Sequence, residues 1–134
     1  MKFTTSLKKN HEFRRLYNKG KSAATQCVVV YCRRNGRQEN RLGVTVSTKI
    51  GGAVQRNRVR RRLKEIYRLN ENTLPVGFDI VIVARVRSRY AGYWEIESSV
   101  LSAFKKLNLS MNRQTVQQTQ QTQQTVQERG AQKR

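Results

Sequence analysis

A run of basic residues in the middle of the chain carries the clearest chemistry in the sequence. Residues 49–64 contain seven Lys or Arg residues and no Asp or Glu. Arginine suits phosphate groups because its planar guanidinium can hold two phosphate oxygens at once. A helix face that only meets solvent usually mixes charge signs, since opposite charges one turn apart stabilise the helix. We therefore interpret this run as a surface that binds a polyanion.

Residues able to catalyse a reaction are scarce elsewhere in the chain. The sequence has one histidine, His11, one aspartate, Asp79, and glutamates that are scattered along it. Hydrolysis by a two-metal site needs several carboxylates together, and the sequence has neither a zinc-ligand spacing nor a Walker-type glycine loop. We assign no catalytic residue and no metal ligand to the chain. We interpret Asp79 as a turn or ion-pairing residue.

The overall charge agrees with a nucleic-acid partner. Across 134 residues, 28 Lys and Arg oppose 8 Asp and Glu, which gives a formal net charge of +20 at pH 7. Such a chain repels itself, and phosphate binding offsets that repulsion. An anionic membrane is the alternative from charge alone, but no segment reaches the ~20 apolar residues of a membrane span. The amino terminus lacks a signal-peptide pattern, so we expect a cytoplasmic protein with no membrane partner.

Three apolar segments and three helical segments should position the basic run. The apolar segments predict strands over residues 26–34, 42–47 and 78–84. The helical segments cover residues 11–18 after a cap at Asn10, residues 53–70 and residues 93–107. The middle helix should turn one apolar stripe toward the sheet, made of Val59, Leu63, Ile66 and Tyr67. The stripe of the last helix contains Trp94, Ile96, Val100, Leu101, Phe104 and Leu107.

The cysteines and the end of the chain complete this organisation. Cys27 and Cys32 lie five residues apart in a predicted strand, so they should point to opposite faces and stay reduced. A single folded domain is expected over residues 1–108. Residues 109–134 are rich in Gln and Thr and cannot bury enough apolar surface to offset chain entropy, which predicts a disordered tail.

The ordered set of motifs around the basic run resembles that of a known family. Arg56, Asn57 and Arg58, preceded by residues 46–51 and followed by residues 59–61, resemble the RNR signature of the bacterial ribonuclease P protein. The flanking segments agree with the same family in order and spacing. They are Leu7 to Asn10 with Phe13 and Gly20, residues 80–85, and residues 101–107. The resemblance covers about residues 6 to 108.

The resemblance implies a fold and a function. The fold is an α/β sandwich of the α+β class, with about four strands covered by three helices, similar to the ribosomal protein S5 domain 2-like fold. It contains a left-handed βαβ crossover, an exception to the usual right-handed rule. The implied function is that of the protein subunit of ribonuclease P, which binds a catalytic RNA and assists endonucleolytic removal of the 5′ leader from precursor tRNA. The RNA and its Mg²⁺ carry the chemistry, with one protein per RNA.

Two sets of site residues follow from the resemblance. The first set contacts the catalytic RNA and comprises Lys49, Arg56, Asn57, Arg58, Arg60, Arg61 and Lys64. The second lines a cleft for the single-stranded leader between the first helix and the sheet, and comprises Phe13, Tyr17, Val29, Tyr31 and Ser47. Aromatic faces beside basic groups suit unpaired bases, and alternation should put Cys27, Val29 and Tyr31 on one sheet face. Phe13 is equally compatible with plain core packing.

The sequence departs from the family pattern in three places, and other functions stay open. Thr48 stands where a second lysine is common, Arg62 stands where an apolar residue is common, and the Gln- and Thr-rich tail has no counterpart in the family pattern. A structural RNA-binding protein of the ribosomal type has similar charge and needs no single-strand cleft. A stand-alone metal nuclease would depend on Asp79 or Glu65. A membrane-active cationic protein would bind anionic vesicles as strongly as RNA.

Overall fold

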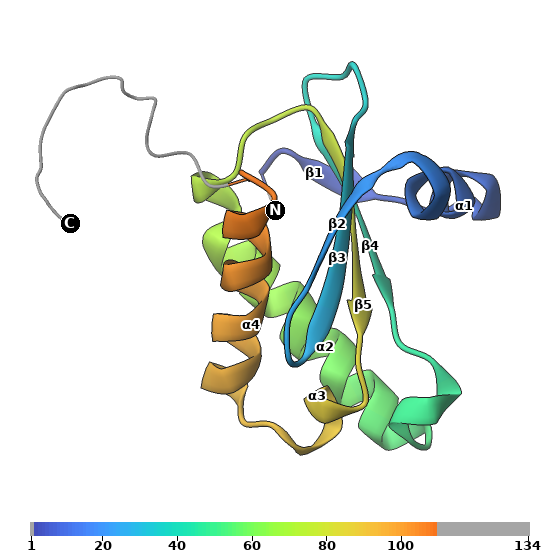
Figure 1. The fold of residues 1–134 in the computed structure, drawn as a ribbon, viewed down its shortest axis with the longest axis vertical. Helices are drawn as coiled ribbons and strands as arrows, with labels where there is room; N and C mark the ends of the chain where they lie inside the picture. The colour runs from blue at the N-terminus through green and yellow to red at the C-terminus, as the bar shows by residue number, and fades with distance from the viewer. Residues whose placement is uncertain (1, 110–134) are drawn as a thin grey trace, which may run out of the picture.

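A computed structural model describes residues 2–109 of the chain, and in this part five strands form one mixed sheet (Figure 1). The strand order is β1-β4-β5-β3-β2. Neighbours β1, β4 and β5 run parallel, whereas β3 is antiparallel to both β5 and β2. The bounds are β1 Thr4–Ser6, β2 Lys21–Ala24, β3 Val28–Arg34, β4 Asn40–Thr45 and β5 Phe78–Ala84.

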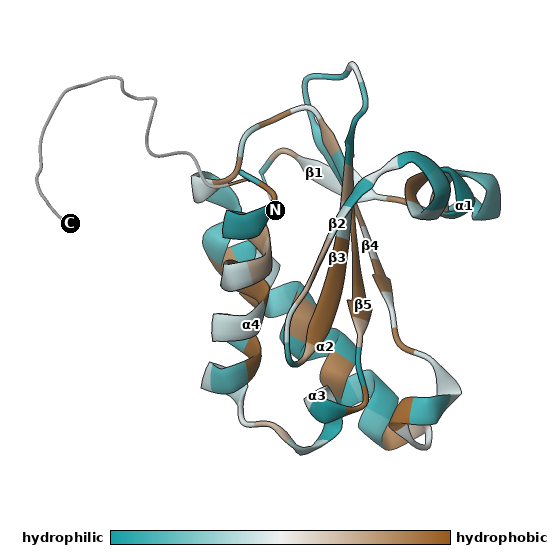
Figure 2. Cartoon of the chain, viewed as in Figure 1, coloured by the Kyte–Doolittle hydropathy of each residue, from teal (hydrophilic) through white to brown (hydrophobic). Residues whose placement is uncertain are grey.

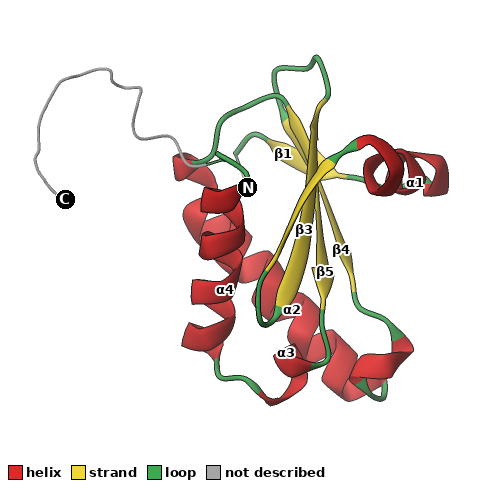
Figure 3. Cartoon of the chain, viewed as in Figure 1, coloured by secondary structure: helices red, strands yellow, loops and turns green. Residues whose placement is uncertain are grey.

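Helices pack against both faces of this sheet (Figures 1 and 3). α2 and α4 cover one face, and α1 lies against the other. The α-helices are α1 Asn10–Lys19, α2 Ala53–Asn70, α3 Arg87–Tyr90 and α4 Tyr93–Lys106. Two single-turn 3₁₀ helices are η1 Thr48–Ile50 and η2 Glu71–Thr73.

The main core lies between the sheet and the pair α2 and α4. All four residues of the predicted α2 stripe are at most 2% exposed, and they share one core cluster with buried residues of β3, β4 and β5. Figure 2 shows the apolar residues gathered on these central strands. A smaller cluster on the other face joins Leu7, Leu16 and Val81, with Phe13 and Tyr31 packed against it. α1 is therefore held on the sheet by few apolar contacts.

The predicted fold class is confirmed, with one more strand than the four expected from the resemblance. β1 and β2 are short edge strands whose residues are mostly polar, so they lack the apolar alternation that reveals a strand in a sequence. α2 connects the adjacent parallel strands β4 and β5, which confirms the βαβ crossover. The left hand of this crossover stays a prediction.

Two predicted details of the helices are wrong. Trp94 is 75% exposed, because it precedes Ile96 by two residues and so lies about 200° around the helix from it. Ile96, Val100 and Phe104 of the predicted α4 stripe do face the core, and each is at most 1% exposed. Asn10 does not cap α1, since it is the first helical residue. The residue before the helix is Lys9, and its backbone N–H donates to the carboxylate of Glu12 at 3.4 Å.

The cysteines are free and buried as predicted, but their predicted placement is wrong. Cys27 and Cys32 belong to the same core cluster. β3 begins only at Val28, so the alternation of the strand does not extend back to Cys27. Cys27 therefore faces the main core and not the sheet face that Val29 and Tyr31 share. Burial raises the pKa of both thiols, which keeps them protonated and unreactive at neutral pH.

The carboxyl end of the described part closes the core. Leu109 is fully buried, so the packed region reaches one residue beyond the predicted boundary at 108. The remainder of the predicted tail, residues 110–134, lies outside the described residues. Within residues 2–109, no helix combines the length and the apolar character that crossing a bilayer requires.

Candidate RNA interface

A tight loop presents the start of α2 to solvent. The Ser47 hydroxyl accepts the backbone N–H of Lys49 at 3.3 Å, which begins η1. Ile50 is 1% exposed and anchors the loop in the core. Gly51 then adopts a φ of +149°, a conformation that side chains disfavour, and Gly52 caps α2. Lys49 is consequently exposed beside the first turn of the helix.

The predicted RNA-binding residues lie along the part of α2 that the core does not cover. Asn57, Arg58, Arg61 and Lys64 are exposed, and Arg60 is half-buried. One guanidinium N–H of Arg60 donates to the Asn57 side-chain oxygen at 3.0 Å. Two shallow hollows flank the helix, and Arg61 borders both. The first is lined by Val54, Asn57, Arg60, Arg61 and Lys64, and the second by Arg58, Arg61, Arg62, Glu65 and Tyr93.

The charge of this face is uncompensated. In the part of the chain that the structure describes, the ion pairs involve Arg41, Arg68 and Arg87, and none of the predicted RNA-binding residues takes part. Arg56 is half-buried, and its Nε is buried without a hydrogen-bond partner among the described residues. A buried donor left unpaired is costly.

An aromatic groove lies on the other face of the sheet, between α1 and the strands. The rings of Tyr17 and Tyr31 meet edge to face, with centroids 4.9 Å apart, and Phe13 lies 6.5 Å from Tyr17. The Tyr17 hydroxyl is 3.3 Å from the Thr45 hydroxyl. The open part of this groove is lined by Asn10, Phe13, Arg14, Tyr17 and Thr45.

The structure brings together most of the residues predicted for the leader cleft. Phe13, Val29 and Tyr31 are half-buried on the α1 face, and Tyr17 is 38% exposed. The two interpretations of Phe13 are compatible, because its ring packs on the small cluster and also lines the groove. Ser47 lies farther along the chain, after β4, where its side chain serves the loop before α2.

Gly43 and Thr45 contribute to the groove although the sequence analysis did not select them. A Cβ atom on Gly43 would lie 2.6 Å from Cε1 of Phe13, so the ring rests directly on the β4 backbone. Alternate residues of a strand face the same way, which puts Gly43 and Thr45 on the α1 face. The signal for them was the alternation of β4, but only the packing of Phe13 shows why a glycine is needed.

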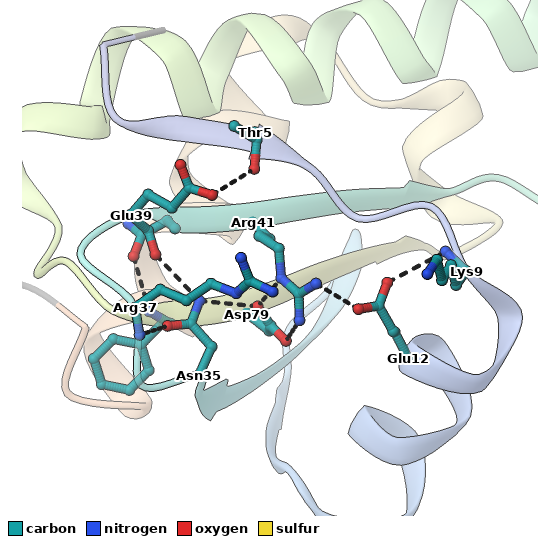
Figure 4. Close-up of polar contacts among 10 residues, drawn as sticks. Thr5, Lys9, Glu12, Asn35, Arg37, Glu39, Arg41 and Asp79 are labelled. Carbon is teal, nitrogen blue, oxygen red and sulfur yellow. Dashed lines mark hydrogen bonds and ion pairs between the residues drawn. The ribbon is translucent and has the colours of Figure 1, made fainter.

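An ion-pair network lies beside the groove and joins α1 to the sheet (Figure 4). Arg41 on β4 donates two hydrogen bonds to Asp79 on β5, at 2.8 and 2.7 Å, and a third to Glu12 on α1. Asn35 donates to Asp79 at 3.0 Å. Arg41 and Glu12 are only 16% exposed and Asp79 14%. The interpretation of Asp79 as a pairing residue is confirmed.

Comparison with known proteins decides the family. A family model described as Ribonuclease P matches residues 1–108. The chain belongs to the ribonuclease P protein family. It is 47% identical over 109 residues to the ribonuclease P protein component of Alkaliphilus oremlandii (strain OhILAs), covering 81% of this chain and 96% of that relative. The counterpart from Clostridioides difficile (strain 630) is 42% identical over 109 residues, with the same coverage.

Solved structures of the family share the fold. The Staphylococcus aureus RNase P protein superposes with a TM-score of 0.73 at 32% identity, over 79% of this chain and 97% of that one. The RNase P protein from Thermotoga maritima gives a TM-score of 0.67 at 33% identity, over 72% and 92%. The predicted family and the predicted function, protein subunit of an endoribonuclease, are thereby confirmed. Membership of the ribonuclease P family implies a partnership with ribonuclease P RNA.

Proposed function

We propose that the exposed basic face of α2 binds the catalytic RNA of ribonuclease P, while the aromatic groove under α1 holds the single-stranded 5′ leader of precursor tRNA. One protein binds one RNA. The observation that carries this division of labour is the placement of two different surfaces on opposite faces of one sheet. One is rich in unpaired cations, and the other combines three aromatic rings with a basic margin.

The basic face suits the phosphates of folded RNA. Arg56, Arg58, Arg60 and Arg61 have no carboxylate partner in the described residues, so they can replace the counterions condensed on RNA phosphates without breaking an ion pair. If six to eight phosphates are neutralised, the slope of log K against log salt is about −4 to −7. Arg56 supports the same view, since its buried Nε still needs an acceptor.

The groove suits an unpaired strand. Bases of any identity can stack on Tyr17 and on the accessible edge of Phe13, while Arg14 at the rim supplies charge for the backbone. The hydroxyls of Tyr17 and Thr45 lie at the same rim and can accept or donate hydrogen bonds. Leader recognition of this kind tolerates many sequences, as a processing enzyme with many precursors requires.

The protein's carboxylates support a non-catalytic role. Glu12 and Asp79 hold Arg41, and Glu65 and Glu95 hold Arg68 and Arg87. Each of these carboxylates is neutralised by an arginine, and residues 2–109 contain no group of three or more His, Cys, Asp or Glu side chains placed to hold a metal ion, as hydrolysis through two metal ions requires. We therefore propose that Mg²⁺ acts on the RNA subunit, and that the protein neutralises phosphates and positions substrate.

The experiment that tests this function is precursor-tRNA cleavage at low Mg²⁺ with protein alone, RNA alone and the two together. We expect leader removal to be much faster with the mixture than with either component. Comparing precursors that have long and very short leaders separates the contribution of the aromatic groove from that of the basic face. Tyr17→Ala should weaken binding only of the long leader, whereas Arg58→Ala should weaken assembly with the RNA for both.

Lys105→Ala serves as a matched control, because this exposed lysine lies at the carboxyl end of α4, away from both surfaces. No gain from the protein over RNA alone would overturn the proposal. Equal losses for long and short leaders with Tyr17→Ala would remove the leader role and favour a purely structural RNA-binding function. Cleavage by the protein alone would place catalysis on the chain itself.

A further inference from the structure

Trp94 is a large aromatic residue that the fold leaves in solvent. It lies in the first turn of α4, where the residue is 75% exposed. Its ring meets that of Tyr93 edge to face, with centroids 5.2 Å apart and an interplanar angle of 90°. The buried face of α4 is fully formed without it, since Ile96 and Val100 fill that side. The core therefore gives no reason for a tryptophan at this position.

Tyr93 connects Trp94 to a basic hollow between α2 and α4. Three arginines line this hollow together with Tyr93, namely Arg58, Arg61 and Arg62. Arg62 is anchored there, because it donates to the backbone carbonyl of Ala91 at 3.4 Å. This gives a role to an arginine at a position where an apolar residue is common in the family.

One carboxylate also lines the hollow, but it is already neutralised. Glu65 accepts two hydrogen bonds from Arg68, at 2.9 and 2.7 Å. Glu95, which follows Trp94, is likewise paired with Arg87 at 2.9 Å. The three arginines of the hollow have no carboxylate partner within the described residues. The hollow is therefore cationic, and the exposed Trp94 ring contacts the Tyr93 ring that lines it.

We propose that this surface binds one unpaired nucleotide of the partner RNA. Its base stacks on the Trp94 indole, and the adjoining phosphates lie on the guanidinium groups of Arg58, Arg61 and Arg62. Indole is the largest stacking surface that a protein offers, and arginine adds planar donors for phosphate oxygens. The inference rests on the proposed RNA-binding role of α2 and extends that site to a second helix.

Charge and continuity favour RNA over other occupants. A second copy of a chain with a net charge of +20 would bring like charges together at this surface. Arg61 lines both hollows beside α2, so an RNA strand that crosses the helix at Arg61 reaches Tyr93 without leaving a cationic surface. The exposed ring of Tyr90 is less suited, because the Arg89 guanidinium lies 5.3 Å from its centre.

Tryptophan fluorescence reports on this site alone, because Trp94 is the single tryptophan of the chain. The full chain is titrated with ribonuclease P RNA while indole fluorescence and RNA affinity are measured together. The same additions to free tryptophan correct for light absorbed by RNA. We expect stacking to quench the emission and to protect it from iodide. Tyr17→Ala, in the leader groove, should leave this quenching unchanged.

Variants test whether the contact contributes to binding. Trp94→Ala should weaken RNA binding about 5- to 150-fold, the range for loss of one stacked base, and Trp94→Phe should restore part of it. The exposed position predicts normal folding of both variants, which circular dichroism checks. Arg62→Gln should reduce the quenching at a given RNA concentration.

Each contrary outcome has a distinct meaning. Full RNA affinity without quenching overturns this inference and leaves the proposed function intact. Quenching combined with unchanged affinity of Trp94→Ala also overturns it, because the indole is then only near the RNA. Quenching by phosphatidylglycerol vesicles but not by RNA would assign the surface to a membrane. Failure of the unaltered chain to bind RNA at all would overturn the proposed function itself.

Discussion

Arg41 and Asp79 are joined by two parallel hydrogen bonds between neighbouring parallel strands, from Nε to Oδ1 at 2.8 Å and from one terminal nitrogen to Oδ2 at 2.7 Å. The other terminal nitrogen of Arg41 binds Glu12 on α1. This network links α1 to the sheet at a place where the apolar cluster under α1 is small. It therefore contributes both to stability and to the shape of the aromatic groove.

Asp79→Ala should destabilise the fold by about 2–4 kcal/mol, because it leaves a largely buried guanidinium without its main partner. Urea unfolding followed by circular dichroism measures the change. Glu65→Ala is the control, since the Glu65 and Arg68 side chains are about half exposed and surface pairs contribute little. Similar unfolding midpoints for the two variants would show that the network does not stabilise α1.

Glu71 should make stability depend on pH. It is 3% exposed, and burial alone would raise its pKa from the ordinary value of 4.5. Hydrogen bonds from the Thr4 hydroxyl and from the backbone N–H groups of Lys2 and Phe3 outweigh burial, so the pKa of Glu71 is lowered. The charged form thus favours the folded state, and its contribution is present above about pH 4.5 and lost as pH falls through the lowered pKa.

The measurement for Glu71 is the free energy of unfolding from about pH 6 to about pH 3. Glu71→Gln should be less stable at the upper end and should lose less stability on acidification than the unaltered chain. Glu12, whose pKa is lowered by Arg41 against the effect of burial, titrates in the same window, so Glu12→Gln is measured in parallel. Identical pH slopes for the unaltered chain and Glu71→Gln would contradict the prediction.

α2 illustrates what the sequence predicts well. Its bounds agree with residues 53–70, and its whole apolar stripe is buried. Both properties are local, because glycines precede the helix and a 3.6-residue period runs through it. β1 illustrates the opposite case. Its three polar residues carry no local signal, and the strand is held in part by Glu71, 67 residues from Thr4.

The candidate sites divide in the same way. The run of arginines can be identified from the local composition of the sequence. The unpaired Nε of Arg56 cannot, because it depends on how closely α2 packs. The spacing of Phe13 and Tyr17 predicts a shared helix face. Their contact with Tyr31 on the α1 face of the sheet was indicated only by the family resemblance. Trp94 was included in the apolar stripe of the last helix because it is hydrophobic, although its position two residues before Ile96 puts it on the opposite side of the helix.

Gly43→Ala should distort the leader groove while leaving the α2 face intact. The new methyl group would lie 2.6 and 2.7 Å from two ring carbons of Phe13, so the ring must move. We expect a loss of about 1–3 kcal/mol of stability from overpacking, and weaker binding of long-leader precursors only. Gly92→Ala is the control, since a methyl group there meets no atom within 4 Å. Unchanged leader affinity in Gly43→Ala would mean that Phe13 does not contact the leader.

Arg56→Met should change stability and RNA binding in opposite directions. Methionine fills similar space and removes the buried Nε that lacks a partner in the described residues, so unfolding should cost the same or about 1 kcal/mol more. Loss of one phosphate contact should lower RNA affinity and reduce the salt slope by about 0.7 to 0.9.

Arg58→Met separates the two effects, because the Arg58 side chain is exposed. It should lose a similar salt slope without any gain in stability. Thermal unfolding and RNA binding at several salt concentrations, measured on both variants, supply the comparison. A clear loss of stability in Arg56→Met would show that the guanidinium packs favourably in the free protein. The unpaired Nε would then be no reason to expect an anion there, and the case for Arg56 as an RNA contact would rest on its charge alone.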